Sequence, residues 1–362
     1  MSSPAILSID AMGGDSAPLS VIDGIAIVAA RDPDLSFILH GDQAILEKAL
    51  AKKPKLEGRV EIRHADDVVE MDAKPSIAVR RGRNSSMWRA LECVRDGDAQ
   101  ATISAGNTGA LMAMALFCLR AASGVARPAI AALWPTRGER SHCVALDMGA
   151  DIRADAQDLV RYAAMGAEYA RIALDIETPR VALLNVGTEE NKGRAEVREA
   201  ADLLRQSDET GDNSFDFNGF IEASEIPHGK ADVIVTDGWT GNVALKSAEG
   251  AAKFVGQHLR EAFSHSIVTK ISAFFAYPSL RRLQRRIDPL RVNGGVFLGL
   301  NGLFVKSHGG ADATGFAAAV DLAASMAREN FADRIAAEVE KTLAPAQGSG
   351  TQVEASEPRA ES

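Results

Sequence analysis

Short apolar runs alternate with longer segments of helical period along almost the whole chain. The apolar runs, each bounded by turn residues, predict β-strands at residues 5–9, 35–39, 60–62, 101–104, 129–133, 143–146, 180–184, 215–217 and 233–236, with a weaker one at 302–306. Helical patterns lie between them, at residues 18–30, 76–94, 109–119, 158–173, 195–206 and 240–263. This alternation is typical of an α/β fold with a mostly parallel sheet flanked by helices.

The helical pattern continues near the end of the chain as one or two closing helices over residues 314–343. No internal repeat and no linker divides the sequence, so we expect a single α/β domain over residues 1–343. Residues 344–362 are rich in small and polar side chains and have no apolar period, which predicts a disordered tail.

Four polar loops follow four of the predicted strands. They are rich in Gly, Asn, Asp and Thr, and they span residues 10–15, 104–109, 185–193 and 237–242. In an open parallel sheet the carboxyl ends of the strands form the ligand crevice. We therefore expect the four loops to open on one edge of the sheet and to form an active site.

The glycines of these loops indicate an anion site, because they let backbone amides converge on a ligand. The loop at 104–109 also precedes an apolar helix, and a helix N-terminus attracts anions. A tight capped turn is the alternative for each loop taken alone. The chain has neither the GxGxxG dinucleotide fingerprint nor the GxxxxGK[ST] phosphate loop, so the motifs support neither NAD nor ATP, and we expect no cofactor.

Charged side chains in or near the loops are candidates for chemistry. Lys192 can neutralise a phosphate, and Lys246 follows Asn242 by about one helical turn. His308 precedes a glycine pair and is the histidine best placed for acid–base work. A solvated loop and a structural histidine are the alternatives.

Composition narrows the classes of function. The formal net charge of −9 argues against general nucleic-acid binding, which depends on phosphate neutralisation. The histidines and the three cysteines show no metal-ligand spacing, so we expect no metal site and buried, reduced thiols. No apolar run reaches transmembrane length, and the N-terminus lacks the pattern of a signal peptide.

Residues 265–290 depart from the surrounding pattern. Aromatic side chains gather at Phe274, Phe275 and Tyr277, and the proline after them predicts a break in the helix. The next segment combines an apolar face with four arginines: Arg281, Arg282, Arg285 and Arg286. We predict a protruding basic amphipathic hairpin that contacts an anionic membrane or an acidic protein. The alternative is a hairpin that packs at a dimer interface, with its arginines in solvent.

The ordered set of motifs resembles the bacterial phosphate acyltransferases, the acyl-ACP:phosphate transacylase or PlsX family. The resemblance runs from about residue 6 to residue 327 and is carried by IDAMGGD at 9–15, KPS at 74–76, NSSM at 84–87, SAGNTGA at 104–110, LNVGTE at 184–189 and TDGWTGN at 236–242. One position departs from the family, which usually has histidine where this chain has Ser16.

The resemblance implies a fold similar to the phosphotransacetylase and isocitrate-dehydrogenase-like groups. It implies a homodimeric enzyme that transfers a fatty acyl group from the thioester of acyl carrier protein to orthophosphate. The acyl phosphate then feeds a glycerol-3-phosphate acyltransferase in phospholipid synthesis. It also implies a cytoplasmic protein peripherally associated with the inner face of the cell membrane. A coenzyme A-dependent phosphotransacylase, a dehydrogenase on the related fold and a non-catalytic membrane-associated scaffold are the alternatives.

For that reaction we expect residues of all four loops to bind phosphate or to take part in catalysis. Candidate phosphate-binding residues are Gly13, Gly14, Gly106, Thr108, Gly109, Lys192, Thr240 and Asn242. Candidate catalytic residues, for proton transfer and for stabilising the oxyanion, are Asp10, Asn107, Asn185, Asp237, Lys246 and His308.

Overall fold

The protein is built around one sheet. The computed structural model describes residues 4–137, 141–210, 214–287 and 294–343. Its strands are β1 (Ala5–Asp10), β2 (Leu35–Gly41), β3 (Val60–His64), β4 (Ala101–Ser104), β5 (Ala129–Pro135), β6 (His142–Leu146), β7 (Arg180–Leu184), β8 (Asp216–Ile221), β9 (Val233–Val235), β10 (Gly295–Leu298) and β11 (Leu303–Lys306). They pair in the order β3-β2-β1-β4-β11-β10-β5-β6-β9-β7-β8. The predicted α/β fold with a mostly parallel sheet is confirmed.

The sheet reverses its direction near the middle. Strands β3, β2, β1, β4 and β11 are parallel to one another, and β10 is antiparallel to both β11 and β5. Strand β6 is antiparallel to β5, and β6, β9, β7 and β8 are again mutually parallel. The carboxyl ends of β7 and β9 therefore lie at the edge opposite to those of β1 and β4. The prediction that all four loops open on one edge is wrong, because apolar runs do not encode strand direction.

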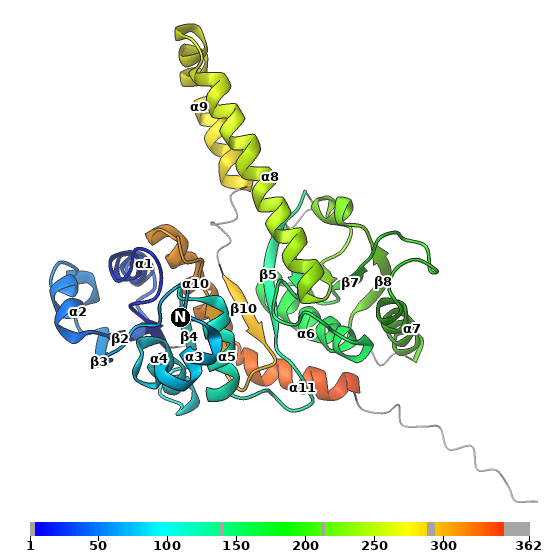
Figure 1. The fold of residues 1–362 in the computed structure, drawn as a ribbon, viewed down its shortest axis with the longest axis horizontal. Coiled ribbons are helices and arrows are strands. Elements are labelled where there is room, and N and C mark those ends of the chain that lie inside the picture. The colour runs from blue at the N-terminus through cyan, green and yellow to red at the C-terminus, as the bar shows by residue number, and fades with distance from the viewer. Residues whose placement is uncertain (1–3, 138–140, 211–213, 288–293, 344–362) are drawn as a thin grey trace, which may run out of the picture.

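Helices cover both faces of this sheet (Figure 1). They are α1 (Leu19–Ala29), α2 (Gln43–Leu50), α3 (Pro75–Arg81), α4 (Ser86–Arg95), α5 (Thr108–Cys118), α6 (Ala156–Leu174), α7 (Ala195–Thr210), α8 (Gly238–Ser264), α9 (Ile267–Ile287), α10 (Ala313–Arg328) and α11 (Phe331–Leu343). The larger apolar core joins α1, α6, α7, α10 and α11 to one face of the sheet. A second core joins α3, α4 and α5 to the other face, and Leu245 of α8 packs against it.

One predicted helix is divided in the structure, and one strand was not predicted. The helix predicted at 76–94 is two helices, because α3 ends before a short 3₁₀ turn at Gly82–Asn84 and α4 starts anew. The side chain of Ser85 caps α4 by accepting a hydrogen bond from the Trp88 amide. Strand β10 was not predicted at all, since its four residues are too few to show a period.

Helices α8 and α9 form a pair that projects from the body of the protein (Figure 1). The chain turns between them at residues 265–266, and α9 continues through Pro278. The prediction that the segment at 274–278 breaks the helix is therefore wrong. In α8 only Gly238 and Gly241 are buried, so the long helix makes few contacts with the rest of its own chain.

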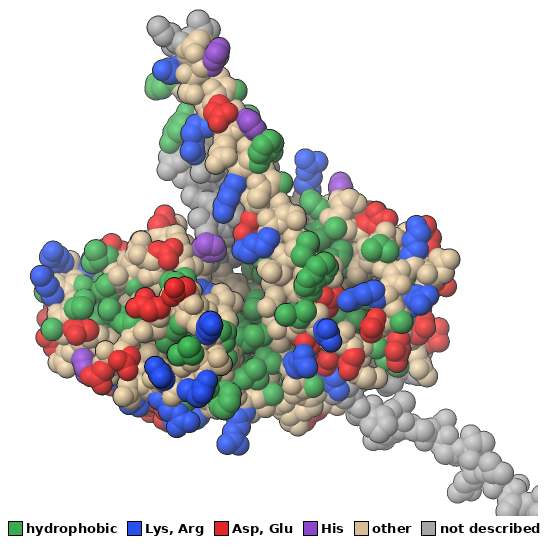
Figure 2. All heavy atoms as spheres, viewed as in Figure 1, with side chains coloured by type: hydrophobic (Ala, Val, Ile, Leu, Met, Phe, Trp, Pro, Cys, Tyr) green, Lys and Arg blue, Asp and Glu red, His purple; other side chains and the backbone are tan. Residues whose placement is uncertain are grey.

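The projecting pair exposes apolar side chains beside charged ones. Phe274 and Phe275 are each 77% exposed and Tyr277 is 60% exposed. Figure 2 shows Lys, His and hydrophobic side chains together along the projection. The four arginines predicted to contact a partner (Arg281, Arg282, Arg285 and Arg286) belong to α9, but their side chains lie outside the described part of the structure.

Two sequence predictions concern membranes and the end of the chain. Among the described residues, no helix combines the length and apolar character needed to cross a bilayer. The tail predicted as disordered, residues 344–362, lies outside the described residues.

We expect Gly166→Ala to lower the free energy of unfolding. A Cβ at Gly166 in α6 would lie 2.5 Å from Cγ1 of Val233 in the sheet. Overpacking of this kind costs about 1–3 kcal/mol, which exceeds the gain of about 1 kcal/mol from better helix propensity. Urea unfolding measures the difference.

The matched control is Gly250→Ala in α8, where a Cβ meets no atom within 4 Å. There the propensity gain acts alone, so the control should be neutral or stabilising. Equal effects of the two substitutions would show that α6 is not packed this closely on the sheet.

Candidate active site

Three loops meet where three neighbouring strands end. Strands β1 and β11 both pair with β4, and Lys306 at the end of β11 stands opposite Ser104 at the end of β4. Beyond the strands, the Ser307 amide donates to the Ser104 carbonyl (2.9 Å) and the Asp15 amide donates to the Gly309 carbonyl (2.9 Å). The loops at 10–15, 104–109 and 307–310 therefore form one polar edge, which we call the β1 edge.

The carboxyl group of Asp10 lies at the centre of the β1 edge and is buried. Its two oxygens accept hydrogen bonds of 2.6 Å from the hydroxyls of Ser86 and Ser104. Burial raises the pKa of Asp10, and the two hydroxyls oppose that shift. Asp10 thus joins the end of β1 to the start of α4 and the end of β4.

Glycines allow these loops to approach one another closely. A Cβ at Gly13 would lie 2.4 Å from Oδ2 of Asp10 and 2.9 Å from the amide nitrogen of Gly106. Gly14 has φ +108°, and its Cβ would lie 3.1 Å from the Gly309 carbonyl oxygen. Any larger residue at these positions would force the loops apart, so the glycine pair fixes the distance between backbone amides.

Asn107 is the N-cap of α5. Its Oδ1 accepts from the Ala110 amide (2.9 Å), while its Nδ2 donates to the carbonyls of Met71 (2.7 Å) and Ala73 (3.1 Å). The side chain is therefore committed to holding the helix start and the neighbouring segment. The first amides of α5, at Thr108 and Gly109, have no acceptor within the helix and remain suited to an anion.

Two cationic or titratable side chains complete the β1 edge. Nζ of Lys306 donates to the Ser307 carbonyl (2.6 Å), and burial lowers the pKa of Lys306 to about 8 although Asp10 and Asp15 act in the opposite sense. Nδ1 of His308 accepts from the Gly310 amide (3.2 Å). Burial is the main cause that lowers the pKa of His308, so the imidazole is largely neutral at pH 7.

The middle of α8 lies near this edge. The charges of Glu249, Lys246 and Lys253 all act on the pKa of His308, which requires that they lie close to it. Lys246 also forms an ion pair with Glu249 (3.0 Å). Helix α8 thus brings the predicted residue Lys246 towards the loops that follow β1, β4 and β11.

The β1 edge gathers many of the predicted site residues: Asp10, Gly13, Gly14, Gly106, Asn107, Thr108, Gly109 and His308. Three of its residues were not among the sequence candidates, namely Ser86, Ser104 and Lys306. The available signal for Lys306 was a lysine that ends an apolar strand directly before Ser-His-Gly-Gly. Ser16, directly after Asp15, is exposed near this edge.

Asp237 lies at the opposite edge and caps α8. Its Oδ1 accepts from the amides of Trp239 (3.1 Å) and Thr240 (3.0 Å), and its Oδ2 accepts from the Thr240 hydroxyl (2.7 Å). The buried carboxylate also forms an ion pair with Arg194. Asn242 follows in α8, where its side chain flanks Gly149.

The loop after β7 is held by hydrogen bonds between its own residues. Oδ1 of Asn185 accepts from the Val186 amide (2.9 Å), and its Nδ2 donates to the Lys192 carbonyl (3.0 Å). Lys192 forms an exposed ion pair with Glu189 (2.7 Å). Within one chain, these residues are thus separated from the β1 edge by the reversal of the sheet.

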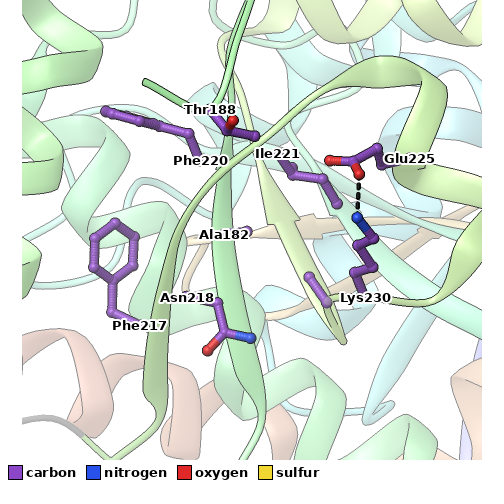
Figure 3. Close-up of a pocket in the computed structure, with 9 residues that line it drawn as sticks. Ala182, Thr188, Phe217, Asn218, Phe220, Ile221, Glu225 and Lys230 are labelled. Carbon is purple, nitrogen blue, oxygen red and sulfur yellow. Dashed lines mark hydrogen bonds and ion pairs between the residues drawn. The ribbon is translucent and has the colours of Figure 1, made fainter. Parts of the chain in front are cut away.

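A separate hollow of about 660 Å³ lies beside β8. Phe217, Phe220 and Ile221 line it, and Lys230 points toward Glu225, with which it forms an ion pair (Figure 3). Because its lysine is already neutralised and none of its lining residues belongs to the β1 edge, we do not assign it to the same site.

Metal and thiol chemistry find little support in the described residues. Within them, no group of three or more His, Cys, Asp or Glu side chains is arranged to hold a metal ion. Cys93, Cys118 and Cys143 are buried and unpaired with one another, and burial raises the pKa of each thiol. A raised pKa disfavours the nucleophilic thiolate.

Comparison with known proteins gives a consistent result. Residues 5–334 match the family model described as "Fatty acid synthesis protein". The phosphate acyltransferase of Ruegeria sp. (strain TM1040) is 54% identical over 353 residues, which are 98% of this chain and 94% of that protein. The phosphate acyltransferase of Jannaschia sp. (strain CCS1) is 55% identical over 341 residues, 94% of this chain and 93% of that protein.

A solved structure supports the fold assignment. The EutD phosphotransacetylase from Staphylococcus aureus matches with a TM-score of 0.59 at 18% sequence identity, over 90% of this chain and 94% of that chain. At this identity the likeness shows a shared fold. The expectation of a fold similar to the phosphotransacetylases is therefore confirmed.

We expect Asn107→Ala to destabilise the protein by about 1–3 kcal/mol, because it removes both the N-cap of α5 and two hydrogen bonds to the preceding segment. Asn107→Ser keeps an uncharged oxygen that can cap α5 and removes the two N–H donors, so its loss of stability should be smaller. Urea unfolding of both variants measures the two parts. Equal losses for both variants would contradict the capping role.

Proposed function

This chain belongs to the phosphate acyltransferase family, and we propose that it transfers a fatty acyl group from the thioester of acyl carrier protein to orthophosphate. The protein is an acyltransferase, as its relatives are. The relatives are named as phosphate acyltransferases, which suggests phosphate as the acceptor, and the family is described as one of fatty acid synthesis. The carrier-protein thioester is the acyl donor that fits this context.

The observation that carries the proposal is the convergence of three glycine-containing loops and two basic side chains on the β1 edge. Gly13 approaches Gly106 closely there, directly before the first amides of α5. Amides and a helix N-terminus suit a phosphate, which needs several donors and a positive potential. Lys306 ends the neighbouring strand β11, and His308 follows two residues later.

In the proposed reaction a phosphate oxygen attacks the thioester carbonyl carbon, and the carbon–sulfur bond then breaks. The hydrogen phosphate dianion is already a nucleophile, so the site acts mainly by holding it against the carbonyl. The proton left on the phosphate passes to the departing sulfur, which gives acyl phosphate and the free carrier thiol. Nδ1 of His308 accepts from the Gly310 amide, so Nε2 carries the proton of the neutral imidazole, and we propose that this N–H donates a hydrogen bond beside the transfer.

The structure modifies the roles expected from the sequence. We propose that Asp10 and Asn107 position the loops, because their side chains are committed to hydrogen bonds within the protein. Asn185 and Asp237 are likewise committed at the opposite edge. We therefore propose that backbone amides of the β1 edge stabilise the oxyanion.

The reaction is tested by incubating the protein with a long-chain acyl carrier thioester and trapping acyl phosphate with hydroxylamine. We expect trapping and release of free carrier only when phosphate is present. Release without phosphate would indicate a thioesterase. A preference for the coenzyme A thioester would favour a coenzyme A-dependent phosphotransacylase, and binding without turnover would favour a scaffold.

Gly13→Ala should lower phosphate-dependent turnover by about 100-fold or more. The added Cβ would lie 2.4 Å from Oδ2 of Asp10, so the loops must shift, and a displacement of about 1 Å has effects of this size. The same trapping assay measures it. Gly256→Ala in α8, where a Cβ meets no atom within 4 Å, is the control and should retain normal turnover. Equal rates for the two variants would exclude the cradle.

The projecting helices support further proposals about partners and location. We propose a cytoplasmic enzyme that contacts the inner face of the cell membrane through α9 and that passes acyl phosphate to a glycerol-3-phosphate acyltransferase. Arginines in α9 are suited to the acidic carrier protein and to anionic lipid. Helix α8 exposes Val243, Phe254 and Val255, and we propose that a second copy in a homodimer covers that surface.

Replacing Phe274, Phe275 and Tyr277 together by serine should weaken binding to anionic vesicles by about 10-fold or more. The three exposed rings would no longer enter the lipid interface, while the β1 edge is untouched. Vesicle sedimentation measures binding, and the trapping assay without lipid should stay normal. Phe117→Ser is the control, since Phe117 is 66% exposed on α5, outside the hairpin. Unchanged sedimentation of the triple variant would contradict the membrane role.

A further inference from the structure

Lys306 is a mostly inaccessible cation at the centre of the β1 edge. It ends β11, which pairs directly with β4, and its backbone stands opposite Ser104. An ammonium group has three N–H donors. Among the described residues, the recorded acceptor for Lys306 is the Ser307 carbonyl, at 2.6 Å. The group therefore retains the capacity to donate to a ligand.

The neighbouring carboxylates do not neutralise Lys306 by direct contact. Asp10 and Asp15 act on its pKa, yet neither forms an ion pair with it within 4.0 Å among the described residues. The oxygens of Asp10 are occupied by the hydroxyls of Ser86 and Ser104. Charges with little access to water are normally paired, so an anion in direct contact with this ammonium would stabilise it.

The lysines predicted from the sequence are less suitable. Lys192 is exposed, forms an ion pair with Glu189 and lies at the opposite edge of the sheet. Lys246 is 60% exposed and forms an ion pair with Glu249. Of these three lysines, Lys306 alone combines low exposure with a position at the end of a strand that pairs with β4.

We propose that Lys306 binds the attacking phosphate, its ammonium contacting the phosphate oxygens while the amides of residues 13–14 and 107–109 hold the other side. This inference rests on the proposed function and names the cation of that same site. It assigns Lys306 to phosphate binding and leaves the thioester to other groups. Its loss should therefore raise the KM for phosphate more than the KM for the carrier thioester.

The proposal has a consequence for pH. Burial lowers the pKa of Lys306 to about 8, with Asp10 and Asp15 opposing, and His308 on the same strand end and Lys246, Glu249 and Lys253 on α8 are the other titratable groups nearby. The Lys306 side chain is a charged ammonium below about pH 8 and a neutral amine above it. Phosphate affinity should thus fall as pH rises through about 8, although phosphate itself becomes more fully dianionic. Without a titrating cation the affinity would stay level or rise.

The experiment compares Lys306→Met and Lys306→Arg with the unmodified enzyme in the trapping assay at pH 7. Loss of the charge should raise the KM for phosphate by roughly 10- to 100-fold, with the KM for the carrier thioester changed less than about threefold. The arginine variant should recover part of the affinity. Lys230→Met is the matched control, because Lys230 pairs with Glu225 in the hollow beside β8, and its phosphate KM should be normal.

The outcomes separate the two claims. If the unmodified enzyme shows no phosphate-dependent release, the proposed function fails and this inference falls with it. If release is normal and Lys306→Met keeps a normal phosphate KM, only the role of Lys306 is excluded. Should Lys306→Met not fold, the arginine variant and the pH profile of the unmodified enzyme decide: a phosphate KM that does not rise above about pH 8 overturns the proposal.

Discussion

The burial of the Asp10 carboxyl group is the constraint on which the β1 edge depends. A buried carboxyl group must find donors, and here the hydroxyls of Ser86 and Ser104 supply them. Those hydroxyls belong to the start of α4 and the end of β4, so satisfying one side chain fixes three segments at once. Gly13 and Gly106 then approach so closely that neither loop has room for a larger residue at Gly13.

That arrangement separates positioning from substrate binding. The side chains of Asp10 and Asn107 form hydrogen bonds within the protein. Backbone amides and the ammonium of Lys306, in contrast, retain N–H donors for a phosphate. Rigid amides need no reorganisation when charge develops on a phosphate or an oxyanion, which is the form of catalysis that a phosphate nucleophile requires. The reversal of the sheet places the loops after β7 and β9 at the other edge of the same chain.

Sequence reasoning predicted the fold class and most of the β1 edge, because apolar runs, glycine pairs and caps are local signals. It did not predict strand direction, since the antiparallel pairings of β10, β5 and β6 depend on contacts between distant segments. Lys306 was missed for the same reason. Its candidacy for phosphate binding depends on its position near Asp10, which contacts between distant segments determine. Pro278 was expected to break a helix, but the chain turns earlier, at residues 265–266.

The central claim is that phosphate binds at the β1 edge, and amide hydrogen exchange with and without millimolar phosphate tests it most directly. We expect phosphate to slow exchange at residues 13–14, 106–109 and 307–310, with little change elsewhere. Slower exchange at residues 185–193 and 237–242 instead would place the phosphate at the opposite edge and contradict the account.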